Sequence, residues 1–534
     1  MEHLTSKGGD DMRLSGHLLP SIQTQGWTPA LIGVNHIELA VVLRLHNEEQ
    51  TFAESRRRGR PWQAEELAVA CGIAEPDRKK LVDWLTSKGL ALMRQSPFVL
   101  WLEGTFEEAA ATLGIGFDFR SHGKIRLFRL NREPMVPDWA AAGISGIVGL
   151  ENVVRHRSKW REPRRTDFLA NQGQGFFPGD LEKAYQFPWQ FDGHGQTLGL
   201  LEFSSGYSVE DAQNFWKAMN VPIPSLQWVS VDNIPNDGGV NPNDLEATLD
   251  VEWAGAMAPG ARLVVYGAGA GTSDQSFGMS MLKALDYAYH DQGHHPQVLS
   301  ISYGDAETRF PAAELMAWDT LMAEGGLLGV TTYIASGDEG AYGVDGVGPR
   351  ICHVDAPACC PHAVSVGGTR LILNSNGSIK SETGWTDTNN NGASGGGISQ
   401  VFKLPSYQSA ISLPLKADEK EGRAVPDVSA NADPDTGYAV YFQGAMTVVG
   451  GTSAATPLWA ALGARLNQAR AQNKKGAIGF LNGDLYNLGG GVMRDITEGN
   501  NNYAGVVGYR CTPGWDAVTG WGSPVASALI KALT

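Results

Sequence analysis

The stretch Thr197-Leu198-Gly199-Leu200-Leu201-Glu202-Phe203 is the first of four near-continuous apolar runs in the chain. The other three are 262–266 (RLVVY), 298–303 (VLSISY) and 329–336 (GVTTYIAS). Segments with helical character intervene, at 208–219, 244–257, 276–291 and 312–324. Strands that are apolar on both faces and alternate with helices are typical of a parallel sheet covered by helices. From about residue 175 onward we therefore predict a doubly wound parallel sheet with its active site at the carboxyl ends of the strands.

The sequence before this sheet predicts a smaller α+β unit. Strands are expected at 35–47, 98–102 and 124–130, and helices at 77–89 and from Thr105 onward. This order is typical of a ferredoxin-like fold. The basic segment 155–165 (RHRSKWREPRR) follows, and a solvated linker of this kind is open to proteolytic nicking. The predicted domains are residues 1–165, including this linker, and 170–534.

Composition excludes several protein classes. At 534 residues, with 42% hydrophobic residues and 15 tryptophans, the chain is neither a single small domain nor disordered. A net charge of −15 argues against a nucleic-acid groove. No apolar run reaches the roughly 18 residues of a membrane span, and the first twenty residues lack an apolar signal core. The odd count of five cysteines favours free thiols, although a bridge from Cys352 to Cys359 or Cys360 stays open.

The run Gly450-Gly451-Thr452-Ser453-Ala454-Ala455-Thr456-Pro457 brings a serine to the start of a predicted helix. A serine or threonine at that place is usually only a helix cap. The glycine pair, however, lets the backbone approach another group closely, and a helix N-terminus favours negative charge near the serine. Ser453 is therefore a candidate nucleophile, which would need a base.

The expected base is a carboxylate. None of the twelve histidines stands in the His-Gly-Thr setting of subtilisin-type enzymes, so a Ser-His-Asp triad is not supported. Glu246 and Asp250 are better candidates, because residues four apart share one face of the predicted helix, together with Trp253. Two carboxyls on an apolar face do not both ionise easily and share a proton. The simpler alternative is a solvated acidic face.

A third acid, Asp338, follows the predicted strand 329–336 in a Gly-Asp turn. An aspartate in such a turn is ordinarily structural. A buried aspartate that stays protonated could instead donate a hydrogen bond to an oxyanion.

Taken in order, these motifs resemble those of the sedolisins, the serine-carboxyl peptidases, and in particular their kumamolisin-like members. The serine motif of the family is Ser-Gly-Thr-Ser followed by a proline, and Gly450 stands in its first place here. Glu246 and Asp250 match the Glu-x-x-x-Asp spacing, and Asp338 matches the family's Gly-Asp. The segments 366–369 (VGGT) and 425–434 (VPDVSANADP) match as well. The resemblance covers about 175–534 closely and implies a subtilisin-like sheet, whereas the first part resembles the family's propeptide more loosely.

The resemblance also implies residue roles. Ser453 would attack the scissile carbonyl, Glu246 would take the serine proton and return it to the leaving amine, and Asp250 would hold the proton that Glu246 shares. Protonated Asp338 and the backbone N–H of Ser453 would stabilise the oxyanion. Two further residues would extend this network: Glu202, which matches the family's additional acid, and Tyr303, which stands where a tryptophan is usual.

A second candidate site lies near the C-terminus, where aspartates flank a glycine-containing turn. Calcium takes carboxylate and carbonyl oxygens as ligands, although composition alone fits a polar surface loop equally well. The resemblance implies one Ca²⁺ ion, held by the carboxylates of Asp495 and Asp516 and by the carbonyls of Ile496, Thr512 and Gly514. Thr512 stands where a glycine is common.

The expected protein is thus an acid-active serine-type endopeptidase, made as a self-processing zymogen with its own propeptide as intramolecular inhibitor. Cleavage between about 160 and 178 would follow when acid weakens carboxylate ion pairs at the domain interface. We expect protein and peptide substrates, no nucleic-acid or membrane partner, a monomer, and secretion, although no conventional signal peptide is visible. The alternatives are a catalytically inactive binding protein on the same scaffold and a neutral subtilisin-type enzyme.

Overall fold

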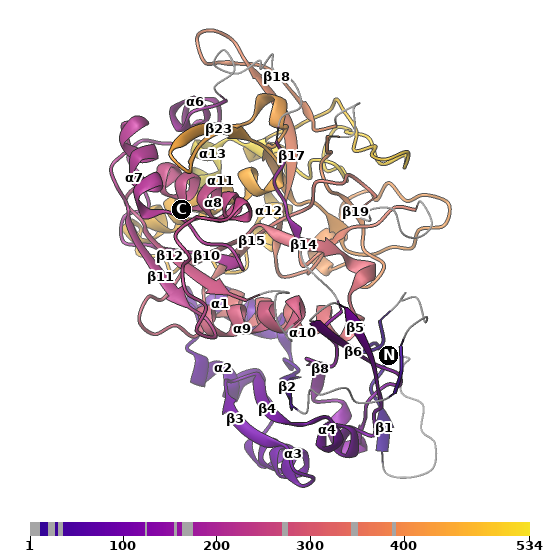
Figure 1. Ribbon diagram of the computed structural model, residues 1–534. Helices are drawn as coiled ribbons and strands as arrows, with labels where there is room; N and C mark the ends of the chain where they lie inside the picture. Colours follow the sequence, from indigo (N-terminus) through magenta and orange to yellow (C-terminus); the bar gives the residue numbers. More distant parts are fainter. Residues whose placement is uncertain are drawn as a thin grey trace. The chain divides into compact units, whose positions relative to one another are not determined.

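The computed structural model describes residues 11–19, 27–29, 36–122, 125–153, 157–162, 175–269, 276–342, 351–386 and 391–534. The chain forms two compact units (Figure 1). The first consists of Met1–His156, Gly269–His290 and Thr308–Leu328, and the second of Arg157–Ala268, Asp291–Glu307 and Gly329–Thr534. The units therefore do not follow chain order, because two helices from the second half belong to the first unit. The predicted boundaries at 165 and 170 stay a prediction.

The second unit is built on an eight-stranded sheet with the order β11-β12-β10-β13-β15-β17-β18, in which β21 also pairs with β17. Every pairing is parallel except the antiparallel β17–β18. The predicted subtilisin-like parallel sheet is thus confirmed. The strands are β10 (Thr197–Phe203), β11 (Ser225–Ser230), β12 (Arg262–Ala268), β13 (Val298–Ile301), β15 (Thr331–Ala335), β17 (Val364–Leu373), β18 (Ile379–Gly384) and β21 (Val428–Asn431).

All four predicted apolar runs became strands of this sheet, since β10, β12, β13 and β15 occupy them. One run was too long as predicted: β13 ends at Ile301, and residues from Tyr303 start β14 (Tyr303–Ala306) in another sheet. That smaller sheet has the order β16-β14-β9, with β16 (Asp355–Ala356) and β9 (Arg157–Ser158) on either side. The break between β13 and β14 leaves Ser302 at the carboxyl end of the parallel sheet.

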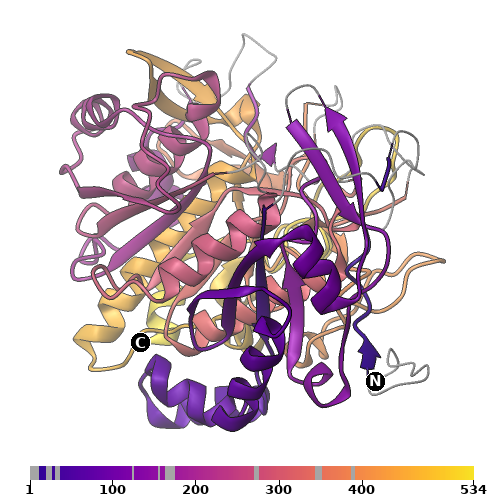
Figure 2. The same ribbon diagram turned by 60° about the horizontal axis from the view of Figure 1, so that its bottom comes forward.

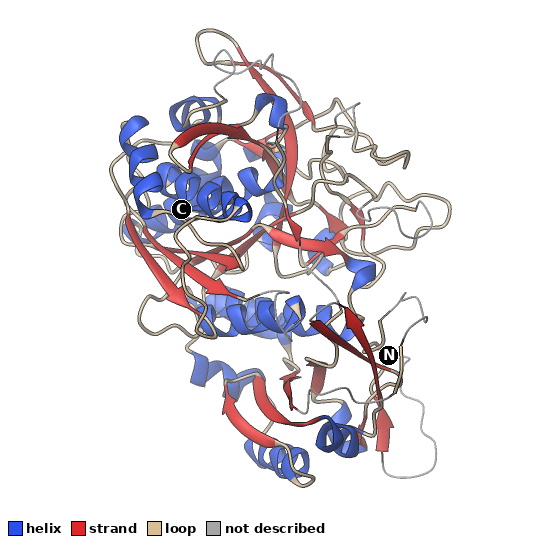
Figure 3. Cartoon of the chain, viewed as in Figure 1, coloured by secondary structure: helices blue, strands red, loops and turns tan. Residues whose placement is uncertain are grey.

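Two helices position the candidate residues on this sheet. All 13 residues of α8 (Leu245–Met257) are buried, as expected for a helix without a polar face. The long helix α11 (Thr452–Gln472) contacts α8 and the strands β10, β13, β15, β17 and β21. Figure 3 draws the helices of this unit in blue and its strands in red.

The remaining elements of this unit are shorter. Its other helices are α6 (Pro178–Ala184), α7 (Val209–Ala218), α12 (Asn482–Leu488) and α13 (Ala526–Leu533). Its other strands are β19 (Gly397–Ile398), β20 (Ala424–Val425), β22 (Tyr438–Phe442), β23 (Ala445–Val449), β24 (Met493–Arg494) and β25 (Ser523–Pro524). Short 3₁₀ turns lie at Pro242–Asp244, Ser406–Gln408, Pro434–Thr436 and Gly489–Val492, and another at Glu307–Arg309 spans the division between the units.

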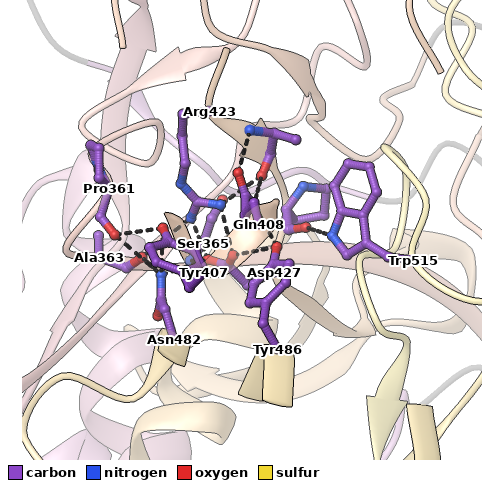
Figure 4. Close-up of polar contacts among 12 residues, drawn as sticks. Pro361, Ala363, Ser365, Tyr407, Gln408, Arg423, Asp427, Asn482, Tyr486 and Trp515 are labelled. Carbon is purple, nitrogen blue, oxygen red and sulfur yellow. Dashed lines mark hydrogen bonds and ion pairs between the residues drawn. The ribbon is translucent and has the colours of Figure 1, made fainter. Parts of the chain in front are cut away.

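A buried ion pair fixes the segment that leads into β21. Arg423 Nη1 lies 2.7 Å from Asp427 Oδ1, and both side chains are fully buried. Asp427 also accepts from Tyr486 Oη at 2.9 Å and from the backbone N–H of Ser365 at 2.7 Å (Figure 4). Removing one partner of such a pair would leave an uncompensated buried charge. Asp427, within the predicted motif 425–434, therefore holds β17 and β21 in register.

The first unit contains a four-stranded antiparallel sheet with the order β3-β4-β2-β8. Its strands follow one another as strand, helices, strand, strand, helix, strand, which is the ferredoxin-like arrangement that we predicted. The elements are β2 (His36–Leu43), α1 (Glu48–Arg58), α2 (Ala64–Cys71), α3 (Glu75–Thr86), β3 (Ala91–Gln95), β4 (Val99–Thr105), α4 (Phe106–Leu113) and β8 (Ile144–Val148).

One detail of that prediction was wrong. The strand expected at 124–130 is not part of this sheet, because β6 (Ile125–Leu130) forms a hairpin with β5 (Phe117–His122); Lys124 lies outside the described residues. The fourth strand is β8 instead. The unit also contains β1 (Asp11–Arg13), β7 (Met135–Pro137), α5 (Asp138–Ala141), α9 (Phe277–Tyr289) and α10 (Ala312–Leu327). Helix α10 packs against β8 and β2, and Figure 2 shows this unit from below.

The five cysteines, all within the described residues, form no disulfide, so the bridge left open from the sequence is absent. In the part of the chain that the structure describes, no helix is long and apolar enough to span a membrane.

Candidate active site

Ser453 is the second residue of α11 and is fully buried. The residue before the helix, Gly451, has φ 108°, which a side chain would strain. Neither hydroxyl belongs to the N-cap residue, because the N-cap is Gly451, and Thr452 Oγ1 donates to Asp338 Oδ1 at 2.8 Å. The helix-cap interpretation of this run is therefore wrong, and Ser453 is held in a buried site beside the end of the sheet.

Three buried carboxyls interact with one another, and we call them the buried carboxyl cluster: Glu202 at the end of β10, Asp250 on α8, and Glu246 on α8, which also lies near Ser453. All three are fully buried, so the alternative of a solvated acidic face does not hold. Among the described residues, four of their oxygens have no hydrogen-bond partner: Glu202 Oε1, both Glu246 oxygens and Asp250 Oδ2. Carboxyl oxygens that face one another in this way are satisfied only when protons are shared between them.

The electrostatics of the cluster agree with this. Burial, and next the charge of Asp250, raise the pKa of Glu246 well above its ordinary value. Burial raises the pKa of Asp250 to about 8 and that of Glu202 well above its usual range. Ser453 lies close enough to Glu246 to lower that pKa somewhat, although the hydroxyl has not reached ordinary hydrogen-bond geometry. Such contacts often tighten only when substrate is bound.

Neutral donors complete the cluster. Tyr303 Oη donates to Glu202 Oε2 at 2.7 Å, and Ser302 Oγ donates to Asp250 Oδ1 at 3.0 Å. Ser302 lies in the break between β13 and β14, and Tyr303 is the first residue of β14. The phenol of Tyr303 is buried against the ring of Phe203, with ring centroids 5.3 Å apart. Tyr303 therefore supplies a hydrogen bond to the additional acid.

Asp338 lies directly after β15 and faces the start of α11. Its Oδ1 accepts from the N–H and the hydroxyl of Thr452, both at 2.8 Å. Its Oδ2 is buried and has no hydrogen-bond partner among the described residues. Burial raises the pKa of Asp338 to about 6, although the charge of Arg161 opposes this rise. A proton on Oδ2 would make this oxygen a donor aimed into the site.

The described residues 157–162 pass through the site as an extended chain. Strand β9 pairs with β14 in antiparallel register, with Ser158 opposite Tyr303. Lys159 donates its N–H to Ser302 O at 3.1 Å and accepts at its own carbonyl from the N–H of Ser453 at 2.9 Å. Arg161 and Gly450 exchange both backbone hydrogen bonds, at 2.9 and 2.8 Å. Peptide backbone therefore lies on both sides of Ser453.

The absence of a side chain at Gly451 makes room for this backbone. A methyl group there would lie 2.3 Å from the carbonyl oxygen of Lys159 and 2.6 Å from Asp338 Oδ2. The Lys159 carbonyl, Asp338 Oδ2 and the N–H of Ser453 thus meet in one small space. This is the geometry of an oxyanion site, with one backbone donor and one carboxyl.

The C-terminal candidate residues also lie together. Asp516 is buried, its Oδ1 accepts from the N–H groups of Val518 and Thr519, and its Oδ2 accepts from the N–H of Thr512 at 3.0 Å. Asp495 Oδ2 accepts from the N–H of Gly514 at 2.9 Å. Among the described residues, no hydrogen bond is given to the carbonyls of Ile496, Thr512 or Gly514. Two carboxylates and three open carbonyls form a donor set that suits Ca²⁺.

Sequence reasoning missed several residues of the site. The buried acids Asp305, Glu339 and Asp355 lie beside the segment 157–162, and Lys159 itself is buried. The remainder of the basic linker, at 155–156 and 163–165, lies outside the described residues. The adjacent acids in Asp338-Glu339 were the one available signal, since a turn at the carboxyl end of a buried strand places both near the site.

Comparison with known proteins places this geometry among peptidases. The model of the subtilase family matches residues 238–480, and that of the pro-kumamolisin activation domain matches residues 31–153. Kumamolisin from Bacillus sp. (strain MN-32) is 35% identical over 521 residues, which make up 94% of this chain and 92% of kumamolisin. Sedolisin from Pseudomonas sp. (strain 101) is 28% identical over 408 residues, covering 73% of this chain and 67% of its own.

Two further relatives are informative. Tripeptidyl-peptidase 1 of Rattus norvegicus is 33% identical over 323 residues, which are 57% of this chain and 54% of that protein. Among solved structures, Pseudomonas sedolisin, a serine-carboxyl proteinase complexed with pseudo-iodotyrostatin, matches with a TM-score of 0.59 at 28% identity. The match covers 67% of this chain and 97% of the sedolisin chain.

Proposed function

The chain belongs to the sedolisin family of serine-carboxyl peptidases, and we propose that it is an acid-active endopeptidase made as a self-processing zymogen. One observation carries the proposal. The buried Ser453 faces carboxyls whose pKa values burial has raised, and no histidine takes part in the described contacts of Ser453, Glu246 or Asp250. A base of this kind is matched to acidic solution.

The proposed reaction uses these groups in sequence. Ser453 Oγ attacks the scissile carbonyl while Glu246 takes the serine proton, and Asp250 holds the proton that the two carboxyls share. The N–H of Ser453 and protonated Asp338 stabilise the oxyanion that forms. Glu246 then returns the proton to the leaving amine, and a water molecule hydrolyses the acyl ester by the reverse use of the same groups. Glu202 and Tyr303 keep Asp250 and its proton in place.

The path of residues 157–162 supports an endopeptidase rather than an enzyme that removes tripeptides from a chain end. In this segment, the carbonyl of Lys159 contacts Ser453. Ser158, on the amino side of that carbonyl, pairs with β14, and Arg161, on its carboxyl side, pairs with Gly450. A substrate would therefore extend through the cleft in both directions. The tripeptidyl peptidases among the relatives make the alternative concrete, and product analysis separates the two.

The zymogen proposal rests on the pro-kumamolisin activation domain matched at 31–153 and on the occupied oxyanion site. In the first unit, Arg94 of β3 pairs with Asp286 of α9 at 2.9 Å, and Lys283 of α9 pairs with Glu38 of β2 at 2.6 Å. Burial would raise the pKa of Asp286, but hydrogen bonds from His290 and Ser96 and the charge of Arg94 hold it below its ordinary value.

The sign of this shift sets the pH at which the contact weakens. A carboxyl whose pKa is lowered by a folded contact stabilises that contact at pH values above the pKa it has in the unfolded chain. This stabilisation is lost as the pH falls through the lower pKa of the folded state. For Asp286 that loss begins below about pH 4, the ordinary pKa of aspartate. We propose that acid activation follows from such carboxyls, and that the protein is a secreted monomer.

We also propose one structural calcium ion, because the residues at the C-terminal loop fit it. Asp495 and Asp516 would supply carboxylates, and Ile496, Thr512 and Gly514 would supply carbonyls. When bound, the ion would balance the buried charge of Asp516 and join two loop segments. It would take no part in peptide hydrolysis.

Ser453→Ala tests the nucleophile. The variant should fold, with an unchanged circular dichroism spectrum, but should lose cleavage of denatured protein at pH 3–5. Wild-type digestion of a long peptide should release internal fragments from the start. Residual activity in the variant would reject the assignment of Ser453, and stepwise release of tripeptides by the wild type would reject the endopeptidase mode. An inactive wild type at every pH would favour the alternative of a binding protein on the same scaffold.

A further inference from the structure

We infer that this peptidase has a carboxylate-lined pocket for the residue on the amino side of the scissile bond, that the pocket selects lysine or arginine, and that its first target is the chain's own Lys159–Trp160 bond. The inference deepens the proposed function and rests on it. It names a substrate class and a processing site, which the sequence alone left between about 160 and 178.

The backbone register identifies the bond. The carbonyl oxygen of Lys159 accepts from the N–H of Ser453 at 2.9 Å and lies in the same small space as Asp338 Oδ2. Lys159 also donates its own N–H to Ser302 O, while Ser158 pairs with Tyr303 in β14. A carbonyl that occupies the oxyanion site is the one that Ser453 would attack. The bond that follows this carbonyl joins Lys159 to Trp160.

The side chain of Lys159 enters a pocket of acids. It is only 1% exposed, and its Nζ lies 2.6 Å from Asp355 Oδ2 and 3.5 Å from Glu339 Oε2. Asp305, which is 1% exposed, adds a third charge that raises the pKa of the lysine. We call Asp305, Glu339 and Asp355 the pocket carboxyls. A lysine is almost never buried to this extent unless it is paired.

The fold builds this pocket independently of the lysine. Strands β14 and β16 pair so that Asp355 is opposite Ala306 and Asp305 is opposite Ala356. Gly337, with φ 112°, lets Asp355 approach the turn that carries Asp338, because a methyl group there would lie 2.5 Å from Asp355 Oδ2. The acids therefore belong to strands and a turn of the peptidase unit, and they would stay in place after residues 157–162 leave.

The next residues differ in their surroundings. The partly buried Trp160 packs against the apolar core of the second unit. Arg161 pairs with Glu339 but is 33% exposed, so water screens its charge. Selection by charge is therefore expected at the position of Lys159 and only weakly at the position of Arg161.

The charges of the pocket carboxyls affect which substrate side chain the pocket binds. Burial raises the pKa of Asp355 to about 7, and the charge of Lys159 opposes that rise. Glu339 and Asp305 raise the same pKa further, and Cys359, whose own pKa burial raises, remains a neutral thiol nearby. A neutral substrate side chain would leave these acids without a cation beside them, whereas a lysine opposes the rise in the pKa of Asp355 and so favours its ionised form. Removing one partner of a buried charge pair costs enough to lower binding roughly 10²-fold.

Self-cleavage at the Lys159–Trp160 bond follows the reaction proposed above. Ser453 Oγ bonds to the carbonyl carbon of Lys159, and its proton passes to Glu246. The bond from that carbon to the nitrogen of Trp160 then breaks, and Glu246 returns the proton to the new amine. Water hydrolyses the ester, which frees the Lys159 carboxylate and restores the serine.

The first experiment follows self-processing of the full chain. After transfer to pH 4, samples taken over time are analysed by intact mass and N-terminal sequencing. We expect the first new N-terminus at Trp160, slower processing of that bond in Lys159→Met, and near wild-type processing in Lys159→Arg. A first cut at another bond in the wild type, or equal rates in Lys159→Met, would overturn the processing site.

The second experiment uses the activated wild-type enzyme and peptides that differ only on the amino side of the scissile bond: lysine, arginine, acetyl-lysine or methionine. At pH 6, we expect kcat/KM for lysine and arginine to exceed that for acetyl-lysine roughly 10²-fold. Asp355→Asn should remove most of this difference, and Asp418→Asn, which changes an exposed acid, should preserve it. The comparison of lysine with acetyl-lysine peptides in the wild type tests charge selection even if Asp355→Asn does not fold.

The outcomes separate the two proposals. If no peptide is cut between pH 3 and 6, the proposed function fails. If acetyl-lysine and lysine peptides are cut equally well, the enzyme is an acid peptidase but the pocket does not select charge.

Discussion

The buried carboxyl cluster and the pocket carboxyls are both buried in the same unit, but among the described residues only the second group has a cation beside it. In the first group, four oxygens lack hydrogen-bond partners among the described residues, and the pKa of every member is raised mainly by burial. In the second, Lys159 Nζ lies 2.6 Å from Asp355. Buried acids that have only other acids and neutral donors as neighbours retain protons, whereas acids around a pocket can bind a cation. Proton transfer needs the first arrangement and substrate selection the second.

The largest expected effect separates the catalytic acids from a structural one on the same helix. Glu246→Gln removes the proton acceptor, so kcat should fall by about 10³-fold with little change in KM. Glu252 is also buried on α8, but its Oε2 accepts from the N–H of Tyr441 and so points elsewhere. Glu252→Gln should keep activity within about threefold. Equal losses in the two variants would show that any buried acid on α8 is needed for folding rather than for proton transfer.

Asp338 interacts electrostatically with one acid of each group, Glu246 and Glu339. Its pKa is raised to about 6, and the proton that it donates is lost as the pH rises through that value. The alkaline limb of the pH profile of kcat should therefore fall above about pH 6. Asp338→Ala should reduce kcat by about 10²-fold, whereas Asp338→Asn keeps a neutral donor and should move the alkaline limb to higher pH. An unchanged limb in Asp338→Asn would assign it to another group.

The pocket should respond to pH in the opposite direction. Lysine binding requires ionised Asp355, and this carboxyl gains charge as the pH rises toward its pKa of about 7. The ratio of kcat/KM for lysine over acetyl-lysine peptides should thus increase between pH 3 and 6, by up to about tenfold per pH unit. Parallel profiles for the two peptides measure the ratio. A ratio that is constant over this range would mean that the selecting acid is already ionised at pH 3.

The C-terminal loop would extend the comparison to a metal cation. If Ca²⁺ balances the charge of Asp516, chelation should lower the Tm by several degrees, since a loss of about 1–2 kcal/mol has that effect in a protein of this size. Asp495→Asn should lower the Tm similarly and make it insensitive to the chelator. Elemental analysis of the purified protein provides the metal content. A calcium-free protein with an unchanged Tm would reject the site.

The smallest expected effect concerns the donor to Glu202. Tyr303→Phe leaves Glu202 Oε2 without its hydrogen bond, which should cost about 1–3 kcal/mol of stability. Because the phenol donates to Glu202 rather than to Ser453 or Glu246, kcat should fall by no more than about tenfold. Thermal unfolding and the acid limb of the pH profile check this. A loss as large as that of Glu246→Gln would place Tyr303 in the proton transfer itself.

Local patterns predicted much of the fold and the elements that carry the candidate site residues. The apolar runs became β10, β12, β13 and β15 because a strand covered on both faces must be apolar throughout. The spacing of Glu246 and Asp250 sufficed to put both on one face of α8. The short β3 was missed because its side chains are mostly exposed and carry no apolar pattern. For Tyr303, the sequence did not predict whether it supports Glu202, because that depends on the break between β13 and β14.

The pocket was beyond sequence reasoning for a different reason. Lys159 lies in a run of basic residues, which is normally a solvated linker, and it is buried only because Asp355 and Glu339 converge on it from distant parts of the chain. Charged residues give no periodic signal that would reveal such a partner. The same holds for the ligands at the C-terminal loop, where carbonyl groups matter and side-chain identity does not.

The connection of β9 to the rest of the chain has a kinetic consequence. The peptide that fills the site is covalently part of the molecule that we propose cuts it, so it would be present at a fixed effective concentration however dilute the protein is. The first cut is then a unimolecular event with a half-time independent of dilution. Enzyme released into a large volume would mature as quickly as in a concentrated store, and pH rather than protein concentration would time its appearance.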